Sequence, residues 1–569
     1  MSVLAKKGDT FTLTYDLFSL PTAQHKAGLA GLVLMIESLK MRRIEPWPVV
    51  EELSPSGARI AFTKESLQVL FDDLYDGDWQ EVSSRTKWKD KEPKRTEETE
   101  VEISGKAKRE KRFIYDAVRP KGAFLQTYYP DGNGLWVKLW RDMLWKTLRG
   151  IPKTRLAFEE RAERKPSSLA SDFWSSLEKA LVQQKKGKVL TESLSSSLFI
   201  GAEDSNAERV PFKGPVSDNF LLHLWPIVSL IHVPRTWSLE RTREEGFRVT
   251  RQEAGFVLSI PEPADLGLFC EDTCDVLRSL DVGSGGLRPR SALIDVHVEG
   301  GLEYLYHFAR LRTLTANGSA SSLCALDLFH LQKQGNRIRQ LAAERVLPRK
   351  DVLTDYELLR EKLRNPVFKT VALRNLIDGK PWYSYFDQPF HQHPMPIFVR
   401  CQGRTPQELI FFGTDVYRKF ESIQIQLKTD AEGGIMDDQT RDNQLAMKIY
   451  RLIQTYANQR TEEKSGKKYK EFSKHKDTDG RIRYPQEYRE AREKVCSDAF
   501  LSIRGRRDQE FIEYFTGTIC SVPQYLNQEE YVAVAGALVT DWEKIKILSM
   551  LALSAHSYLP GNNETQEVK

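Results

Sequence analysis

The stretch LTYDLFSLPTAQHKAGLAGLVLMIESLKMRR, residues 13–43, carries the clearest structural pattern in the chain. Leu13, Tyr15 and Leu17 alternate with polar residues, which predicts a β-strand. A Pro-Thr pair then marks a turn, and apolar residues recur at helical spacing from Ala27 to Leu39. The stretch therefore predicts a strand, a turn and a helix.

Two glycines interrupt this predicted helix. Gly28 and Gly31 each cost a helix about 1 kcal/mol relative to alanine, so they need another role. Because a glycine lacks a Cβ atom, a neighbouring backbone can come close to it. We therefore expect a second segment to pack directly against this helix, as part of an α/β core.

The length and composition indicate several globular domains. A chain of 569 residues is too long for one hydrophobic core and suggests two to four domains. With 40% hydrophobic residues, global disorder is excluded. We predict an α+β fold in three parts. Residues 1–400 form a mixed α/β region with room for two subdomains. Residues 401–435 form a linker and connecting helix, and residues 436–569 form an all-α helical bundle. The bundle prediction depends on helical patterns at Asp415–Leu427, Asp438–Glu463, Pro485–Ile503, Asp508–Cys520 and Gln528–Ser554.

Five further stretches carry predictions about single elements. Glu65–Tyr75 and Trp136–Leu148 have helical spacing, and we expect the tryptophans of the second to lie in the core. Phe124–Tyr129 is predicted as an aromatic strand, and Leu323–Lys333 as part of a mainly helical region. Phe386–Pro396 contains three prolines and is predicted as a linker or docking loop.

The sequence contains no targeting or membrane signal. The lysines near the start are not followed by an apolar segment, and runs such as Leu29–Ile36 are far shorter than the roughly 20 residues that cross a bilayer. Six cysteines over this length do not form a disulfide framework and fit a reducing compartment. We expect a soluble cytoplasmic protein.

The net charge of +5 does not by itself demand nucleic acid, because phosphate binding depends on where basic residues cluster. Residues 83–112 are charged and nearly free of large apolar side chains, which predicts a solvated loop or hairpin. The alternative is an arm that tracks a phosphate backbone. Its best candidates for gripping DNA are Lys106, Lys108, Arg109, Lys111 and Arg112.

Three loops could contact nucleic acid directly. The turn Gly132–Gly134 is thin enough to enter a groove, and Asn133 could pair with a base edge. A second loop carries Asn206, Arg209 and Lys213. A third, VGSGGLRPR, resembles a phosphate-binding nest but lacks the end of a P-loop, and its candidate residues are Gly283, Ser284, Gly285, Arg288 and Arg290.

No catalytic site emerges from the sequence. Cys270 and Cys274 lack a second ligand pair at metal-site spacing, and His223 and His232 sit in an apolar segment that predicts core histidines. No His-Asp dipeptide and no Walker loop is present. We expect a non-catalytic protein without metal or cofactor. The alternative is a metal-dependent nuclease built around His391 and His393.

The stretch EGGIM, residues 432–436, carries a signal at the level of its codons. Glu-Gly-Gly is written with a purine run that resembles a ribosome-binding site just upstream of the Met436 codon. Translation from Met436 would produce residues 436–569, which is most of the predicted bundle. The alternative is a loop that happens to contain methionine.

The amino-acid sequences of two stretches resemble those of a known family. Tyr15-Asp16-Leu17 with LPTAQHKAGLAGL at residues 20–32, and Leu222-His223-Leu224-Trp225-Pro226, look like the large subunit of type I-B CRISPR interference complexes. The resemblance spans the whole chain in length and order. It implies a crRNA-guided Cascade complex in antiviral defence, and a small subunit made as copies of this chain's C-terminal domain.

The resemblance also implies roles and partners. The large subunit recognises the PAM of double-stranded target DNA, holds the crRNA 5′ handle and helps start the R-loop, together with the backbone, handle-binding and small subunits and the CRISPR helicase-nuclease. We expect the three loops to serve the PAM or strand separation. We expect the bundle to hold the non-target strand through Lys464, Lys467, Lys468, Lys470, Arg504, Arg506 and Arg507. A purely structural RNA-binding scaffold is the third alternative.

Overall fold

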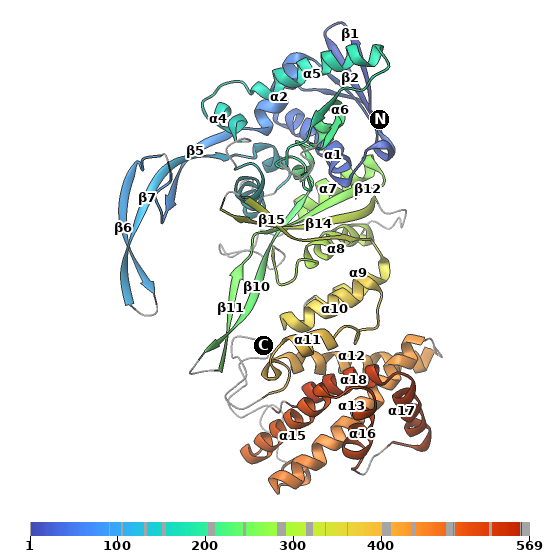
Figure 1. The fold of residues 1–569 in the computed structure, drawn as a ribbon. Coiled ribbons are helices and arrows are strands. Elements are labelled where there is room, and N and C mark those ends of the chain that lie inside the picture. The colour runs from blue at the N-terminus through green and yellow to red at the C-terminus, as the bar shows by residue number, and fades with distance from the viewer. Residues whose placement is uncertain are drawn as a thin grey trace. The chain divides into compact units, whose positions relative to one another are not determined.

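The computed structural model divides the chain into two compact units, and Figure 1 shows their elements. It describes residues 2–89, 91–103, 106–129, 134–150, 155–202, 211–242, 246–280, 292–314, 322–335, 337–360, 362–400, 411–433, 438–473, 482, 484–522, 526–557 and 559. At 99–103, 106–109, 239–242, 246–249, 251, 311–314, 350, 351, 354, 358, 432 and 433 it describes the backbone only. Unit 1 comprises Met1–Arg235 and Glu253–Arg349, and unit 2 comprises Thr236–Gln252 and Lys350–Lys569.

Unit 1 begins with a four-stranded antiparallel sheet in the order β1-β2-β4-β3. Its strands are β1 (Val3–Lys7), β2 (Thr10–Asp16), β3 (Val49–Ser54) and β4 (Gly57–Phe62). The apolar residues that alternate along β2 are all buried, which confirms the predicted strand. The short helix η1 (Leu17–Ser19) then leads into the turn.

Helix α1 (Ala23–Arg42) is buried along most of its length. Thr22 caps its N-terminus by accepting a hydrogen bond from the His25 backbone N–H. A Cβ atom on Gly28 or Gly31 would overlap the carbonyl oxygen of Leu221 or Leu224, respectively. The expected close approach of a second backbone is therefore confirmed.

A six-stranded sheet has the order β11-β10-β12-β14-β15, with β13 parallel to β10, and it belongs to unit 1 except for residues 236–252 of β10 and β11, which cluster with unit 2. Helix α1 contacts β12, and Lys26 of α1 forms an ion pair of 2.6 Å with Glu262 of β12. The strands of this sheet and the two helices in the same part of the chain are β10 (Leu230–Thr242), β11 (Gly246–Glu253), β12 (Phe256–Pro263), β13 (Leu293–Ile294), β14 (Leu323–Gln334), β15 (Arg337–Val346), α7 (Leu266–Ser279) and α8 (Glu299–Leu314).

A three-stranded sheet in the order β5-β7-β6 forms an arm that projects from unit 1 (Figure 1). Its strands are β5 (Gly77–Ser84), β6 (Arg95–Ile103) and β7 (Lys106–Pro120), so the charged segment is a hairpin, as predicted. The remaining elements of unit 1 are α2 (Lys64–Leu74), η2 (Ala123–Thr127), α3 (Leu135–Met143), the π-helical turn η3 (Leu144–Leu148), α4 (Leu156–Ala162), α5 (Ser168–Lys185), β8 (Thr191–Ser193), β9 (Lys213–Pro215), α6 (Val216–Leu221) and η4 (Trp225–Ile227).

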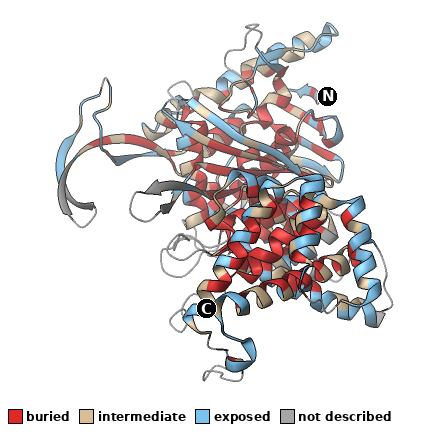
Figure 2. Ribbon diagram, turned by 60° about the horizontal axis from the view of Figure 1, so that its bottom comes forward, coloured by how far each residue is buried: buried red, intermediate tan, exposed pale blue. Residues whose placement is uncertain are grey.

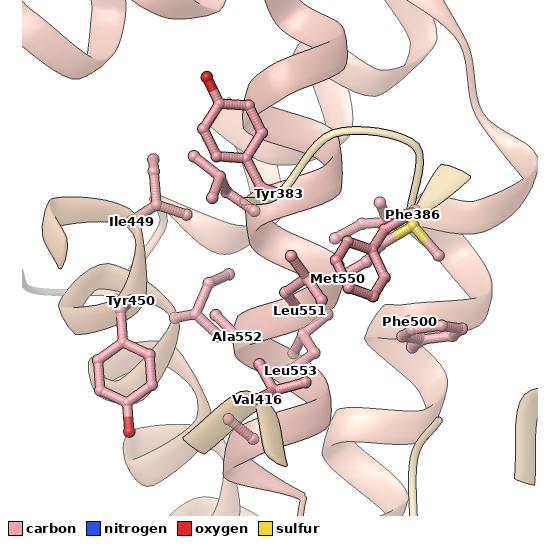
Figure 3. Close-up of a cluster of buried hydrophobic side chains, with 14 of the residues drawn as sticks. Tyr383, Phe386, Val416, Ile449, Tyr450, Phe500, Met550, Leu551, Ala552 and Leu553 are labelled. Carbon is pink, nitrogen blue, oxygen red and sulfur yellow. The ribbon is translucent and has the colours of Figure 1, made fainter. Parts of the chain in front are cut away.

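Unit 2 is mainly helical and surrounds one hydrophobic core. Phe386, Val416, Phe500 and Leu551 are among its almost fully buried side chains, and Figure 3 shows how they gather around one helix. Buried residues fill the interior of the helical region in Figure 2, whereas its outer helix faces are exposed. The helices are α9 (Lys350–Leu359), α10 (Pro366–Asp378), α11 (Asp387–Gln392), η5 (Met395–Ile397), α12 (Phe412–Gly433), α13 (Asp438–Ser465), α14 (Tyr469–Phe472), α15 (Gln486–Gly505), α16 (Asp508–Tyr514), η6 (Phe515–Ile519), α17 (Gln528–Thr540) and α18 (Trp542–His556). These elements confirm the predicted α+β fold, with sheets in the N-terminal half and helices in the C-terminal region.

Two element predictions in unit 1 are wrong. Phe124–Tyr129 forms the helical turn η2 instead of a strand, because Phe124, Leu125 and Tyr128 all turn toward the core and the Tyr128 hydroxyl donates to the Leu34 carbonyl of α1 at 2.5 Å. Leu323–Lys333 is strand β14 instead of helix. It pairs with β12 on one side and β15 on the other, and this pairing overrides the helix propensity of leucine and alanine.

Two predictions in unit 2 also need correction. Phe386–Pro396 is no linker, because it forms α11 and part of η5, and its phenylalanines Phe386 and Phe390 are fully buried. The helix predicted for Gln528–Ser554 is two helices. Asp541 separates them by capping α18, where its carboxylate accepts a hydrogen bond from the Lys544 backbone N–H at 3.2 Å.

The compact units divide the chain at Arg349, whereas the predicted linker lies at 401–435. Helices α9 to α11 cluster with the C-terminal helices because Leu363, Phe368 and Phe390 contribute to the same core. The functional division into residues 1–400, 401–435 and 436–569 stays a prediction.

Alanine at Gly28 should destabilise unit 1. The substitution improves helix propensity by about 1 kcal/mol, but the clash with the Leu221 carbonyl should cost more, so we expect a net loss of about 2 kcal/mol in the free energy of unfolding. The control is Gly536→Ala in α17, where a new Cβ meets no atom within 4 Å and should stabilise by about 0.5–1 kcal/mol. Equal stabilisation by both variants in denaturant titrations would contradict the packing described for α1.

His556 should make unit 2 sensitive to acid. Burial, and then Arg492, lower the pKa of His556 to about 3, while its ring packs 4.2 Å from that of Tyr450. An unfolded histidine has a pKa near 6.5, so below that pH only the unfolded state gains the proton and stability falls by about 1.4 kcal/mol per pH unit. We expect His556→Gln to flatten the dependence of unfolding free energy on pH between 6.5 and 4.5. Parallel curves for the variant and the wild type would count against this.

Candidate nucleic-acid interface

Most of the predicted loop residues lie outside the described residues. This applies to Asn133, Asn206, Arg209, Gly283, Ser284, Gly285, Arg288, Arg290 and Met436. Lys213 is described at the start of β9, where it is exposed. The structure therefore neither joins nor separates the three loops.

Between residues 94 and 112, the described basic side chains of the arm face acidic partners. Strand β7 carries the five predicted DNA-gripping residues, but Lys106, Lys108 and Arg109 are described by backbone alone. The ammonium of Lys111 lies 3.9 Å from a Glu98 oxygen, and the guanidinium of Arg112 lies 2.8 Å from a Glu110 oxygen.

The base of the arm shows the same compensation. Hydrogen bonds from Arg95 and Lys94 lower the pKa of Glu81 to about 2, and Arg95 also pairs with Glu97 at 2.7 Å. Ion pairs between exposed partners contribute little stability, but they neutralise the cations locally. The described arm is thus less suited to phosphate binding than its count of basic residues predicts.

A different group of cations in unit 1 is only partly compensated. Arg119 of β7, Arg155 at the N-cap of α4 and Lys333 of β14 form what we call the β7–β14 basic cluster. Burial lowers the pKa of Lys333, and the charges of Arg119 and Arg155 lower it further, so the three side chains are close enough to repel one another. Within this cluster, as far as the described residues show, only Arg155 has an ion pair, 2.9 Å from Glu159.

An aromatic side chain completes this cluster. The Arg119 guanidinium lies 5.2 Å from the ring centroid of Trp145, and burial lowers the pKa of Arg119 despite the opposing charge of Asp142. Trp145 belongs to the π-helical turn η3, which contacts both β7 and β14. π-Helical turns occur often at functional sites because they shift a side chain out of helical register.

A buried arginine lies at the end of the same turn. Arg149 is 1% exposed, and its Nη2 donates to the His223 carbonyl at 3.0 Å. Its Nε and Nη1 have no hydrogen-bond partner among the described residues, and burial lowers its pKa.

No local signal in the sequence points to the β7–β14 basic cluster. Arg119, Arg155 and Lys333 come from distant parts of the chain, and β7 and β14 belong to different sheets that both contact η3, so tertiary packing brings these residues together. The prediction that Leu323–Lys333 is helical also hid the position of Lys333. Only knowledge of how β7 and β14 pack around η3 would have revealed this group.

In unit 2 the predicted strand-binding residues fall into two groups. Lys464 lies 3.5 Å from Asp498, and Lys467, Lys468 and Lys470 are exposed nearby in the chain. Arg504 lies in the last turn of α15, and Arg506 and Arg507 lie between α15 and α16. Arg504 donates to the His391 carbonyl at 2.9 Å, and the Arg506 guanidinium lies 4.5 Å from the ring of Tyr514.

The predicted core histidine His223 is confirmed, because its Nδ1 lies 2.6 Å from the Tyr75 hydroxyl. His232 is also buried, though its Nδ1 has no partner among the described residues. Burial raises the pKa of Cys274 to about 11 and that of Cys270 further, so both thiols stay protonated at neutral pH.

His391 and His393 lie in and beside α11, and the His393 ring packs 5.2 Å from Trp237. Across the described residues, no group of three or more His, Cys, Asp or Glu side chains could hold a metal ion. In the same part of the chain, no helix combines the length and apolar character that a membrane span requires.

Comparison with known families covers most of the chain. Residues 47–317 match the model described as the type I-B CRISPR Cas8b N-terminal domain. Residues 323–556 match the model described as the type I-B CRISPR Cas8b C-terminal domain. A search of curated proteins finds no match. The two family matches confirm the resemblance noted in the sequence, and the chain belongs to the Cas8b family of type I-B CRISPR large subunits.

Proposed function

We propose that this chain binds target DNA within a crRNA-guided Cascade complex, recognises the PAM and helps to start the R-loop in antiviral defence. Membership of the Cas8b family supports the setting of a CRISPR complex. The observation that carries the DNA-binding step is the β7–β14 basic cluster. We infer that phosphates of the target duplex occupy it.

The physical argument is one of uncompensated charge. Arg119 and Lys333 approach each other without an ion-pair partner among the described residues, so their repulsion raises the free energy of the unbound protein. A phosphate group would relieve that repulsion and release counterions from DNA. Because phosphate contacts carry no sequence information, this cluster would position the duplex and leave base reading to other groups.

The three loops remain the candidates for reading bases or parting the strands. Asn133, Asn206, Arg209 and Lys213 are proposed for the PAM, since amide and guanidinium groups pair with base edges. The nest at residues 283–290 is proposed for a phosphate or for the wedge. In this division, guide pairing reads the target sequence and the protein reads only the short motif beside it.

The proposed partners are crRNA, double-stranded target DNA, the backbone, handle-binding and small subunits, and the CRISPR helicase-nuclease. A start at Met436 would supply the small subunit. We propose a non-catalytic role without metal or cofactor. The alternatives are a nuclease around His391 and His393 and a scaffold that binds only RNA, and duplex binding by the purified chain separates the scaffold from the main proposal.

Neutralising the cluster should weaken duplex binding for every sequence. We expect Arg119→Gln with Lys333→Gln to reduce affinity about tenfold or more, because a hydrogen bond to a charged group contributes about 1.5–3 kcal/mol. The slope of log affinity against log salt should become shallower by about 0.9 for each phosphate that the variant no longer neutralises. Fluorescence anisotropy with a labelled duplex over a salt series measures both quantities.

The control is Lys186→Gln with Lys188→Gln, which removes two exposed charges after α5. It keeps the same net charge as the cluster variant but should leave the salt slope unchanged. If both double variants lose affinity equally, the effect reflects overall charge and the assignment of the cluster fails.

The asparagines should affect motif preference instead. We expect Asn133→Ala or Asn206→Ala to reduce the preference for PAM-containing duplex over a mutated PAM, because each bidentate base contact contributes about 1–3 kcal/mol of discrimination. Binding to DNA that lacks the motif should not change. Competition assays with both duplexes test this, and an intact preference in both variants would move PAM reading to another loop.

A further inference from the structure

The π-helical turn η3 continues α3 in a different helical register. The backbone N–H of Arg149 closes it by donating to the carbonyl of Leu144, five residues earlier. π-Helical turns are rare and occur often at functional sites. The register of η3 therefore depends on contacts that its last residues make outside the turn.

Arg149 and Gly150 hold the C-terminal end of η3. The Arg149 guanidinium donates to the His223 carbonyl at 3.0 Å, which ties the turn to the segment that packs against α1. His223 is itself held, because the Tyr75 hydroxyl lies 2.6 Å from its Nδ1. A Cβ atom at Gly150 would overlap the carbonyl oxygen of Trp145, so only glycine fits there. Both residues thus fix the register in which η3 presents Trp145.

Three aromatic rings link Arg149 to the β7–β14 basic cluster. The Arg149 guanidinium lies 5.2 Å from the ring centroid of Tyr75. The Tyr75 ring meets the ring of Phe158 in α4 edge-on, with centroids 4.9 Å apart, and Phe158 meets Trp145 edge-on at 6.1 Å. The Arg119 guanidinium in turn lies 5.2 Å from the centroid of Trp145. A continuous column of side chains therefore runs from Arg149 to Arg119.

The same column places a second cation of the cluster. The backbone N–H of Phe158 donates to the carbonyl of Arg155 at 3.0 Å, in the first turn of α4, so the position of the ring constrains that of Arg155. Helix α4 approaches β7 closely at Gly77 of β5, where a Cβ atom would lie 3.2 Å from the carbonyl oxygens of both Arg119 and Phe158. Because Arg119 and Arg155 both repel Lys333, the cluster keeps its spacing only where the fold holds its members.

The energetics of Arg149 argue against a role in stability alone. The side chain is 1% exposed, yet its Nε and Nη1 have no hydrogen-bond partner among the described residues. A buried polar group that is left unpaired lowers stability, and an apolar side chain of similar volume in place of a buried charge is often neutral or stabilising. An arginine at this site is better explained by what it positions than by what it stabilises.

We propose that Arg149 is a positioning residue for the β7–β14 basic cluster. It holds η3 in its π-helical register and, through the column of rings, sets the spacing of the cations that bind DNA phosphates. Arg149 itself touches no DNA. The inference rests on the proposed function and deepens it, because a site that is held in its binding geometry before DNA arrives loses less conformational freedom on binding.

A double-mutant cycle tests this with the purified full-length chain and a fluorescein-labelled duplex, in anisotropy titrations over a salt series. Arg149→Met should weaken duplex binding about fivefold in the otherwise unchanged chain. In the Arg119→Gln background the same change should weaken binding less than twofold, because the cation that Arg149 positions is already gone. The slope of log affinity against log salt should become shallower by about 0.9 in Arg149→Met, the value for one lost phosphate contact.

Two further variants complete the experiment. Arg492→Met is the matched control in unit 2, where a buried arginine donates to another histidine carbonyl, that of His556, at 2.7 Å. It should lower the thermal unfolding midpoint and leave duplex affinity within twofold of the wild type. Phe158→Leu interrupts the column without removing a buried charge. It should repeat the fivefold loss and its dependence on Arg119, and it decides the question if Arg149→Met does not fold.

A fivefold loss that persists in full in the Arg119→Gln background would overturn the inference, because the effect would then be independent of the cluster. Unchanged duplex binding in Arg149→Met, or an equal loss in Arg492→Met, would also overturn it. If Arg119→Gln with Lys333→Gln leaves duplex binding unchanged, the proposed use of the cluster fails and this inference fails with it. If that double variant loses affinity but the cycle is additive, only this inference fails.

Discussion

The backbone of α1 lies directly against the carbonyl oxygens of Leu221 and Leu224, and the architecture of unit 1 depends on this contact. The segment from Leu221 to Ile227 in turn holds the region around η3. The Trp140 indole donates to the Pro226 carbonyl at 2.9 Å, and Arg149 donates to the His223 carbonyl. Because η3 also contacts β7 and β14, the two small residues Gly28 and Gly31 help to place Trp145 beside Arg119.

The basic surfaces of this molecule differ more in how far acidic side chains neutralise their cations than in how many cations they contain. The arm has the longest run of basic residues, yet glutamates and aspartates partner its described cations between residues 94 and 112. The β7–β14 basic cluster contains fewer cations, but Arg119 and Lys333 repel each other. A polyanion gains more free energy where it relieves repulsion than where it must displace an existing ion pair.

The sequence predicted the elements whose pattern is local. The strand at Leu13–Leu17, the helix that follows it and most helices of unit 2 needed only periodicity and capping residues. Strand β14 was mistaken for helix because its pairing partners lie far away in the chain, and η2 for a strand because its burial is decided by contacts with α1. The basic cluster escaped prediction because tertiary packing joins elements that are distant in the chain, whereas the arginines at 504–507 could be proposed from the sequence because they are consecutive or nearly so.

The most direct test of the account asks which part of the chain touches the target duplex. The assembled complex is loaded with duplex that carries a photo-crosslinkable base beside the PAM, irradiated and analysed by peptide mass spectrometry. The account predicts DNA adducts on peptides that contain Arg119, Trp145 or Lys333. Adducts confined to residues 83–112 of the arm, or crosslinks of these peptides to crRNA alone, would contradict it.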